Sequence, residues 1–109
     1  MAIKGKTKAF YLARARVAKA LAHPSRLMIL EALRDRERCV AELTDLIRAD
    51  QSTVSKHLAV LRNAGILEDR KEGSMSIYRL KCPCVLDVFS CVETVLKENL
   101  KSQAASLRS

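Results

Sequence analysis

Residues 51–64 are the segment that most constrains the fold of this chain, because they are apolar on one side of a helix and polar on the other. Asp50, which precedes the segment, can cap a helix, and Gly65, which follows it, can adopt the left-handed conformation that commonly ends one. The pattern predicts a short helix with both ends fixed and one side packed on a core. At about 100° per residue, that apolar side holds Val54, Leu58 and Leu61.

Three further helices are predicted before this segment. Residues 7–22 carry an apolar stripe of helical period that ends before Pro24. Ser25 is the expected N-cap of the second helix, which fades in the charged surface turn 34–38. The third helix is short, covers about residues 40–47 and is followed by a tight turn.

Two strands and one more helix are predicted in the second half of the chain. The extended segments 66–70 and 76–80 are joined by the charged, turn-rich residues 71–74, which indicates a hairpin. The last helix begins near Cys84 and continues for about sixteen residues, with a broad apolar stripe that needs a partner. Residues 101–109 are polar and are expected to form a flexible tail.

The order of these elements is that of a winged helix-turn-helix with an additional helix at each end. The predicted fold class is therefore mainly α, with α+β character in the wing. We expect a single domain over residues 1–109, of which about residues 7–100 are structured. The chain is small and 49% hydrophobic with only 4% aromatic residues, so its helical core is modest and a second copy would add burial. We therefore expect a homodimer.

The outward side of residues 51–64 suits entry into a DNA major groove, because its side chains are short and polar and Lys56 adds charge without bulk. An ordinary solvated helix face is the alternative. The hairpin adds basic and hydroxyl side chains that can contact phosphates. The candidate DNA-contacting residues are Gln51, Ser52, Thr53, Ser55, Lys56, His57 and Arg62 on the helix and Arg70, Lys71 and Ser74 in the hairpin.

Some of these candidates also have a structural interpretation. His57 lies beside the apolar side of its helix, which favours a packing or capping role over a phosphate contact. His23, before Pro24, is expected to be structural. Arg79 on the returning strand is a further candidate for a phosphate contact, although each wing residue is equally compatible with a solvated position.

The net charge of +8 and the pI near 9.7 indicate a polyanionic partner, for which nucleic acid and a membrane surface compete. No apolar run of signal-peptide length follows the basic N-terminal segment, and none approaches the roughly 18 residues of a membrane span. We therefore expect a cytosolic protein that binds double-stranded DNA and no membrane. The cations of the N-terminal segment, which has no acidic residue, are Lys4, Lys6, Lys8, Arg14, Arg16 and Lys19.

The cysteines of the chain are Cys39, Cys82, Cys84 and Cys91. Cytosolic thiols are kept reduced, so free thiols, metal ligands and redox switches are the interpretations that remain. The sequence has no nucleophile and base constellation, no phosphate-binding glycine loop and no Cys-x-x-Cys, so we expect neither an enzyme nor a small organic substrate. A small thiol metal carrier or redox protein is the alternative of another class.

Four runs of sequence resemble the ArsR/SmtB family of metal-sensing repressors, and together they cover about residues 10–100. The resemblance implies a homodimer, associated through its first and last helices, in a bacterial or archaeal cytoplasm. It also implies that the dimer binds operator DNA and leaves the DNA when an ion binds. The four runs are Leu21–Leu33, Cys39–Leu43, Gln51–Leu67 and Arg70–Leu80.

The family has two ion sites with which the cysteines can be compared. Its short helix before the recognition helix often carries Cys-Val-Cys-Asp-Leu, of which Cys39 keeps only the first cysteine. Cys39 is therefore expected to be a small buried residue, with a contribution to a site assembled elsewhere as the alternative. The second family site takes an Asp-x-His pair and a His-x-x-Glu pair from the other subunit. Here Cys82 and Cys84 replace the first pair, and Val95 and Glu98 stand where the second would be.

Cys82, Cys84 and Cys91 are the resulting candidate metal ligands. Three thiolates suit a thiophilic, three-coordinate ion such as trivalent arsenic or antimony, so arsenite or antimonite is the expected inducer. In a regular helix Cys84 and Cys91 lie about 10 Å apart along the axis. Either the chain at residues 81–84 folds back over the first turn, or Cys91 comes from the second subunit. Cadmium, lead or zinc, and a persulfide or oxidant acting on the same thiols, remain alternatives.

Overall fold

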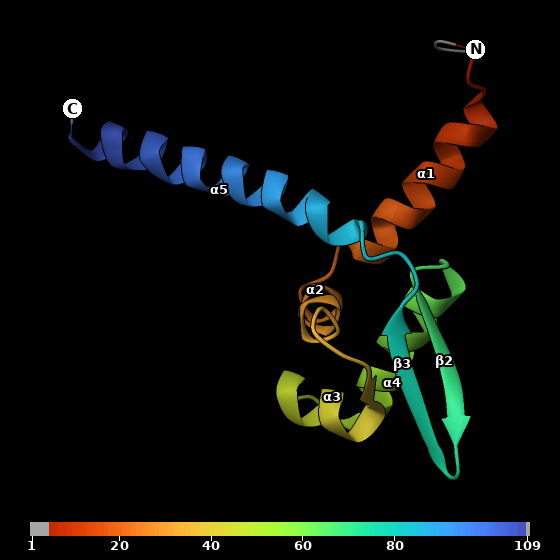
Figure 1. Ribbon diagram of the computed structural model, residues 1–109. Coiled ribbons are helices and arrows are strands. Elements are labelled where there is room, and N and C mark those ends of the chain that lie inside the picture. Colours follow the sequence, from red (N-terminus) through yellow and green to blue (C-terminus); the bar gives the residue numbers. More distant parts are fainter. Residues whose placement is uncertain (1–4, 109) are drawn as a thin grey trace.

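The chain folds into five helices and a small sheet, which the computed structural model describes for residues 5–108 (Figure 1). The middle three helices and the sheet form the body of the molecule, and the first and last helices project from it in different directions. This is the predicted winged helix-turn-helix with an additional helix at each end. In chain order the helices are α1 (Lys8–Leu21), α2 (Pro24–Ala32), α3 (Val40–Ile47), α4 (Gln51–Asn63) and α5 (Val85–Arg108).

The sheet has three antiparallel strands in the order β1, β3, β2. Strands β2 (Leu67–Glu72) and β3 (Met75–Leu80) form the hairpin, here called the wing, in which Arg70 lies opposite Ile77. Strand β1 (Arg38–Cys39) pairs with the other edge of β3 and was not predicted, because two residues carry no alternating pattern. Its pairing joins the segment before α3 to the wing.

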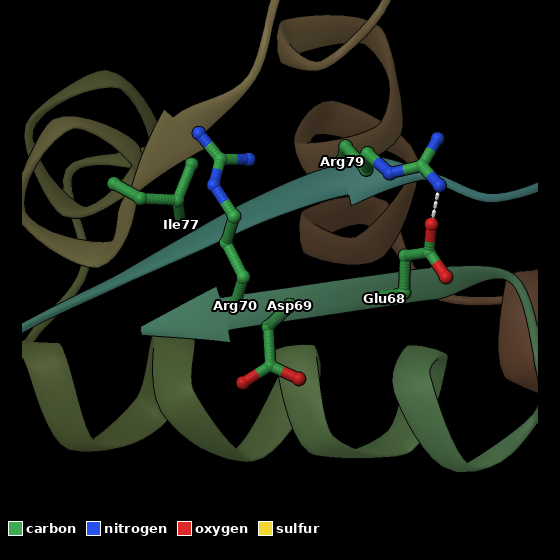
Figure 2. A pocket seen from close by; sticks show the side chains of 5 residues that line it. All are labelled: Glu68, Asp69, Arg70, Ile77 and Arg79. Carbon is green, nitrogen blue, oxygen red and sulfur yellow. Dashed lines mark ion pairs between the residues drawn. The ribbon is translucent and has the colours of Figure 1, made fainter. Parts of the chain in front are cut away.

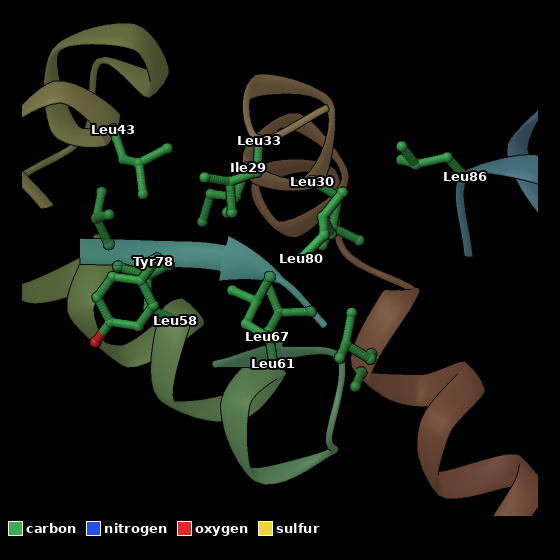
Figure 3. Close-up of a cluster of buried hydrophobic side chains, with 13 residues drawn as sticks. Ile29, Leu30, Leu33, Leu43, Leu58, Leu61, Leu67, Tyr78, Leu80 and Leu86 are labelled. Atoms are coloured by element: carbon green, nitrogen blue, oxygen red, sulfur yellow. The ribbon is translucent and has the colours of Figure 1, made fainter. Parts of the chain in front are cut away.

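The core lies between α2, α3, α4 and the sheet, and one side of α4 enters it as predicted (Figure 3). Tyr78 of β3 and Leu86 of α5 are also buried against this cluster. Because α4 is anchored by its apolar side, its polar side faces away from the core. The largest fully buried side chains are Ile29, Leu30, Leu43, Val54, Leu58, Leu61 and Leu67.

The ends of α4 follow the two signals in the sequence. The Asp50 side chain accepts a hydrogen bond from the backbone N–H of Thr53 at 2.7 Å, as an N-cap does. Gly65 has a φ of +82°, a conformation in which other residues are strained. Both predicted helix ends are confirmed, and α3 has the predicted bounds as well.

The start of α2 differs from the prediction that Ser25 caps it. His23 is the N-cap, and its Nδ1 accepts a hydrogen bond from the Ser25 N–H at 3.1 Å. Pro24 takes the first helical position, where its missing N–H leaves no hydrogen bond unmade. The ring nitrogen of His23 thus does what a serine hydroxyl was expected to do, and Ser25 lies inside the helix.

The wing and the last helix are both longer than predicted. The wing strands reach Glu72 and resume at Met75, so the predicted connection over residues 71–74 shortens to two residues. Helix α5 has 24 residues rather than about sixteen, because it continues to Arg108 through the segment expected to be a flexible tail. Neither α5 nor any other helix within residues 5–108 is apolar enough to cross a bilayer.

Truncation of Leu58 tests the anchoring of α4. Leu58 is fully buried, and removal of such a side chain costs about 2–5 kcal/mol of unfolding free energy. Leu46→Ala is the matched control, because Leu46 is 50% exposed on the surface of α3. Chemical denaturation should show a large loss for Leu58→Ala and a much smaller one for Leu46→Ala. Equal losses would contradict this account of the core.

Candidate nucleic-acid interface and thiol site

The outward side of α4 presents the polar surface that the sequence predicted. Its side chains are short or flexible, and none of the exposed residues of this helix is aromatic. Nothing bulky therefore prevents this side from approaching a groove of a duplex. The exposed predicted contacts on α4 are Gln51, Ser52, Thr53, Ser55, Lys56 and Arg62.

The N-terminal turn of α4 is organised by the carboxylate of Asp50. This carboxylate accepts hydrogen bonds from the Thr53 N–H and from the Ser52 hydroxyl, the latter at 2.9 Å. Hydrogen bonds from Thr53 and Ser52 lower the pKa of Asp50, so it is an anion at the start of the helix. The Ser52 hydroxyl is thus engaged in the cap, whereas Gln51 and Ser55 flank it on the exposed surface.

His57 takes the packing role that its place beside the apolar side of α4 favoured. Its ring centroid lies 4.3 Å from that of His23, and its Nδ1 accepts a hydrogen bond from Arg26 Nε at 3.2 Å. Arg26 also donates to the carbonyls of Lys19 and Ala20 at 3.4 Å. This cluster joins the end of α1 to α2 and α4. Sequence reasoning missed Arg26, and a DNA contact by His57 stays a prediction.

The outer face of the wing carries arginines that are already paired with carboxylates. Arg70 Nη1 lies 2.7 Å from Glu37 Oε1, and Arg70 Nη2 lies 3.0 Å from Glu72 Oε1. Arg79 forms an ion pair with Glu68 on the neighbouring strand, which Figure 2 shows beside Arg70. Sequence reasoning missed these acidic partners; Glu37 lies far from Arg70 in the chain, whereas Glu72 is only two residues away on the same face of the strand.

The inner face of the wing holds a different set of side chains. Strand geometry alternates side chains between faces, and Figure 2 shows Asp69 pointing away from Arg70 and toward the helix drawn below the strands. Asp69 Oδ2 lies 3.7 Å from Arg62 Nη1 of α4, which links the two elements. Lys71 donates to Ser76 Oγ at 2.5 Å, and Ser74 is exposed at the wing turn. The predicted contacts Arg70 and Lys71 therefore lie on opposite faces.

The positive charge of the chain is not concentrated on residues 38–80, which run from β1 to β3 and are here called the DNA-binding module. Residues 38–80 hold seven Lys and Arg against six Asp and Glu, whereas residues 1–30 hold seven cations and no acid. The cations of α1 are exposed, and Lys4 lies outside the described residues. The N-terminal end of α1 and the tip of the wing lie at opposite ends of the molecule in Figure 1. The net charge therefore says little about how strongly the module itself attracts DNA.

The projecting helices expose apolar side chains that a single chain leaves uncovered. Leu86 is the only residue of α5 that is buried, although the helix carries a long apolar stripe. On α1, Phe10 and Val17 are about two-fifths exposed. A surface of this kind is typical of an interface between proteins. The exposed apolar residues of α5 are Val88, Val92, Val95, Leu96, Leu100 and Leu107.

The three candidate ion ligands are exposed free thiols. Cys82 and Cys84 lie in the segment between the wing and α5, and Cys91 lies on α5 itself. No three of the histidines, cysteines, aspartates and glutamates within residues 5–108 are close enough to hold one metal ion. Cys82, Cys84 and Cys91 are therefore not drawn together within the described residues. The choice between a fold-back of residues 81–84 and a Cys91 from the second subunit stays a prediction.

Cys39 lies apart from the other thiols, at the start of α3. It is half-buried and is the N-cap of this helix, and its N–H donates to Glu42 Oε1 at 3.2 Å. The same carboxylate forms an ion pair with Arg36 at 2.6 Å, and hydrogen bonds from Arg36 and Cys39 lower the pKa of Glu42. This position agrees with the structural role expected for Cys39.

Comparison with protein families finds one match over the middle of the chain. The family described as bacterial regulatory protein, arsR family, matches residues 23–69. The HTH-type transcriptional regulator Rv0081 of Mycobacterium tuberculosis is 36% identical over 98 residues, which are 89% of this chain and 86% of that protein. The crystal structure of Rv0081 superimposes with a TM-score of 0.77 at 33% identity and covers 90% of this chain and 99% of its own.

Two further relatives bear on assembly and ligand. The solution structure of the homodimeric winged helix-turn-helix DNA-binding domain of Mb0332 from Mycobacterium bovis has a TM-score of 0.74 at 33% identity, and the match covers 92% of this chain and 95% of that one. The arsenic resistance transcriptional regulator ArsR1 of Pseudomonas putida is 48% identical over 65 residues, which are 59% of this chain and 51% of that protein.

The His57 cluster predicts a pH dependence of stability. Burial, and then the charges of His23 and Arg26, lower the pKa of His57 from its ordinary value of 6.5. Below pH 6.5 the unfolded chain therefore binds a proton that the folded chain does not, so stability present above this pH is lost as the pH falls toward the folded pKa.

His57→Gln keeps an oxygen that can accept from Arg26 but does not titrate. On going from about pH 7.5 to about pH 5.5, the melting temperature of the wild type should fall further than that of His57→Gln. Parallel melting curves for the two proteins would refute this account of the cluster.

Proposed function

Because this chain belongs to the arsR family of bacterial regulatory proteins, we propose that it is a homodimeric repressor that binds operator DNA when free and leaves it when a thiophilic ion binds. The family consists of transcriptional regulators and not of enzymes. The observation that carries the proposal is α4, which is anchored by Leu58 and its apolar neighbours and presents an exposed polar side. A helix held in this way is the element that winged helix-turn-helix proteins place in the major groove.

The second copy of the chain covers the apolar surfaces of α1 and α5. The stripe on α5 is about half-exposed at Val92 and Leu96, and Val17 of α1 is exposed to a similar degree. Burial of this area would supply the stabilisation that a small core lacks. The homodimeric assembly of the Mb0332 domain supports this arrangement. In the dimer, the two α4 helices would enter successive major grooves about 34 Å apart.

The ion binds at thiols contributed by both subunits. Cys82 and Cys84 lie just before α5 as exposed thiols, and Cys91 of the second subunit supplies the third ligand. Three sulfur ligands favour trivalent arsenic or antimony. The similarity to ArsR1, an arsenic resistance regulator, supports this choice.

The position of Cys82 supplies a route from the thiols to the DNA-binding helix. Cys82 Sγ lies 3.9 Å from the carbonyl oxygen of Gly65, the residue that ends α4, and the Lys81 N–H donates to the Ile66 carbonyl at 2.9 Å. Displacement of Cys82 toward an ion would therefore disturb the end of α4. Allosteric coupling is typically about 1–3 kcal/mol, and near-complete release needs about 5 kcal/mol.

Lys56→Gln tests the assignment of α4 to the groove. Lys56 is exposed on α4, and the loss of one phosphate contact per protomer should weaken binding and reduce the slope of log affinity against log salt by about one per contact. The probe is a duplex selected by the protein from a random pool, and fluorescence anisotropy gives the affinity. Lys97→Gln on α5 is the control with the same change in charge. Equal effects of the two substitutions would argue against this use of α4.

Serine substitution tests the thiol site. Cys82→Ser, Cys84→Ser and Cys91→Ser should each bind the selected duplex as the wild type does, because the thiols lie off the polar side of α4. Each should lose the release caused by arsenite. Parallel titrations with cadmium, lead, zinc and peroxide distinguish the other inducers that the same thiols would serve. Arsenite-driven release that persists in all three variants would rule out this site.

Mixed dimers distinguish a site between subunits from a site within one. A dimer of one Cys82→Ser, Cys84→Ser chain and one Cys91→Ser chain keeps a complete site only if Cys91 acts across the interface. Such a dimer should recover part of the response to arsenite, which anisotropy measures, whereas each parent homodimer should not. A mixed dimer as unresponsive as its parents would contradict the shared site.

A further inference from the structure

We infer that Glu37 and Glu72 compete with DNA phosphates for Arg70, and that this competition limits how tightly the wing holds a duplex. The inference rests on the proposed function and deepens it, because it assigns two acidic residues to the control of DNA affinity. Neither residue is a predicted DNA contact.

The sheet brings these three residues together although they are distant in sequence. Arg70 of β2 lies opposite Ile77 of β3, and Cys39 of β1 pairs with the same Ile77 from the other side. Glu37 directly precedes β1, on the other side of β3 from Arg70, and the long Arg70 side chain reaches its carboxylate diagonally across β3. Figure 2 shows the Arg70 side chain extending from its own strand over the neighbouring strand, beside Ile77.

Every nitrogen of the Arg70 guanidinium has a carboxylate partner. Nη1 contacts Glu37 Oε1 at 2.7 Å, whereas Nη2 and Nε contact Glu72 Oε1 at 3.0 and 3.2 Å. A guanidinium donates to a phosphate through the same planar pair of N–H groups through which it donates to a carboxylate. These contacts use three of the five N–H donors of the guanidinium, so a DNA phosphate that binds Arg70 competes with both carboxylates for the same cation.

The exchange is feasible because the pairs lie on the surface. The side chains of Arg70, Glu37 and Glu72 are 47%, 39% and 54% exposed. Ion pairs this exposed hold together weakly, whereas a phosphate contact also gains from the release of counterions. Glu37 and Glu72 thus lower the affinity of the wing for DNA without preventing binding.

The other cations of the wing indicate that this competition is confined to its outer face. Arg79 on the same face is likewise paired, with Glu68. Lys71 on the opposite face donates to the Ser76 hydroxyl, a neutral partner that leaves its charge available. Glu68 and Glu72 are two of the six acidic residues that nearly balance the seven cations of residues 38–80.

The test measures binding of the full-length protein to a 30-base-pair duplex of unselected sequence, the length being about three helical turns. The double variant Glu37→Gln, Glu72→Gln should bind roughly threefold to tenfold more tightly than the wild type at low salt, with a salt slope steeper by about one per added phosphate contact. Glu98→Gln removes one carboxylate from an exposed pair with Lys101 on α5, 3.8 Å apart, and is the control of matched charge for the single variant Glu72→Gln.

Glu98→Gln should change the affinity much less than the double variant does. Addition of Arg70→Gln to the double variant should remove the gain in affinity, because the Arg70 guanidinium makes the added phosphate contact. The single variant Glu72→Gln keeps the contact between Arg70 and Glu37, and its affinity for the duplex is measured in the same way. Circular dichroism checks that each variant is folded.

Three results would overturn the inference: a double variant that binds no tighter than Glu98→Gln, one that binds more weakly than the wild type, or a gain that survives Arg70→Gln. A wild-type protein that does not bind duplex DNA at all would instead refute the proposed function, and this inference with it. The two failures are therefore distinguishable in a single set of titrations.

Discussion

Val54, Leu58 and Leu61 bury one side of α4 in the core, and the other functional features depend on this contact. It fixes the rotation of the helix about its axis, so the polar side points outward without any side chain having to hold it there. The Asp50 cap and the positive φ of Gly65 then fix where the helix begins and ends. The same packing places the end of α4 next to the segment that carries Cys82.

Electrostatics on the DNA-binding module are more balanced than the net charge suggests. The arginines of the outer wing face lie in ion pairs with acidic neighbours, whereas most of the uncompensated charge of the chain lies in residues 1–30. A module of this kind would bind unspecific DNA weakly, because that binding is set mainly by phosphate contacts. Recognition would then depend on the polar side of α4, where Gln51 and Ser55 can reach base edges.

Local patterns predicted most of the elements, and the contacts that join distant segments were what the sequence could not predict. The bounds of α3 and the caps of α4 follow from neighbouring residues, so Asp50 and Gly65 were sufficient to predict them. Strand β1 exists only because β3 offers a free edge, and the link from Glu37 to Arg70 depends on that pairing. The His23 cap escaped prediction because serine is the commoner N-cap. The choice between a thiol site within one chain and a thiol site shared by two chains does not follow from the sequence, because it depends on how two copies pack together.

The stoichiometry of the DNA complex, measured by native mass spectrometry, tests the central claim most directly. The probe is a duplex that the protein selects from a random pool. The account predicts two protein chains on one duplex, because the apolar surfaces of α1 and α5 pair two copies and each copy supplies one α4. A complex with a single chain, or the absence of any selected duplex, would contradict it.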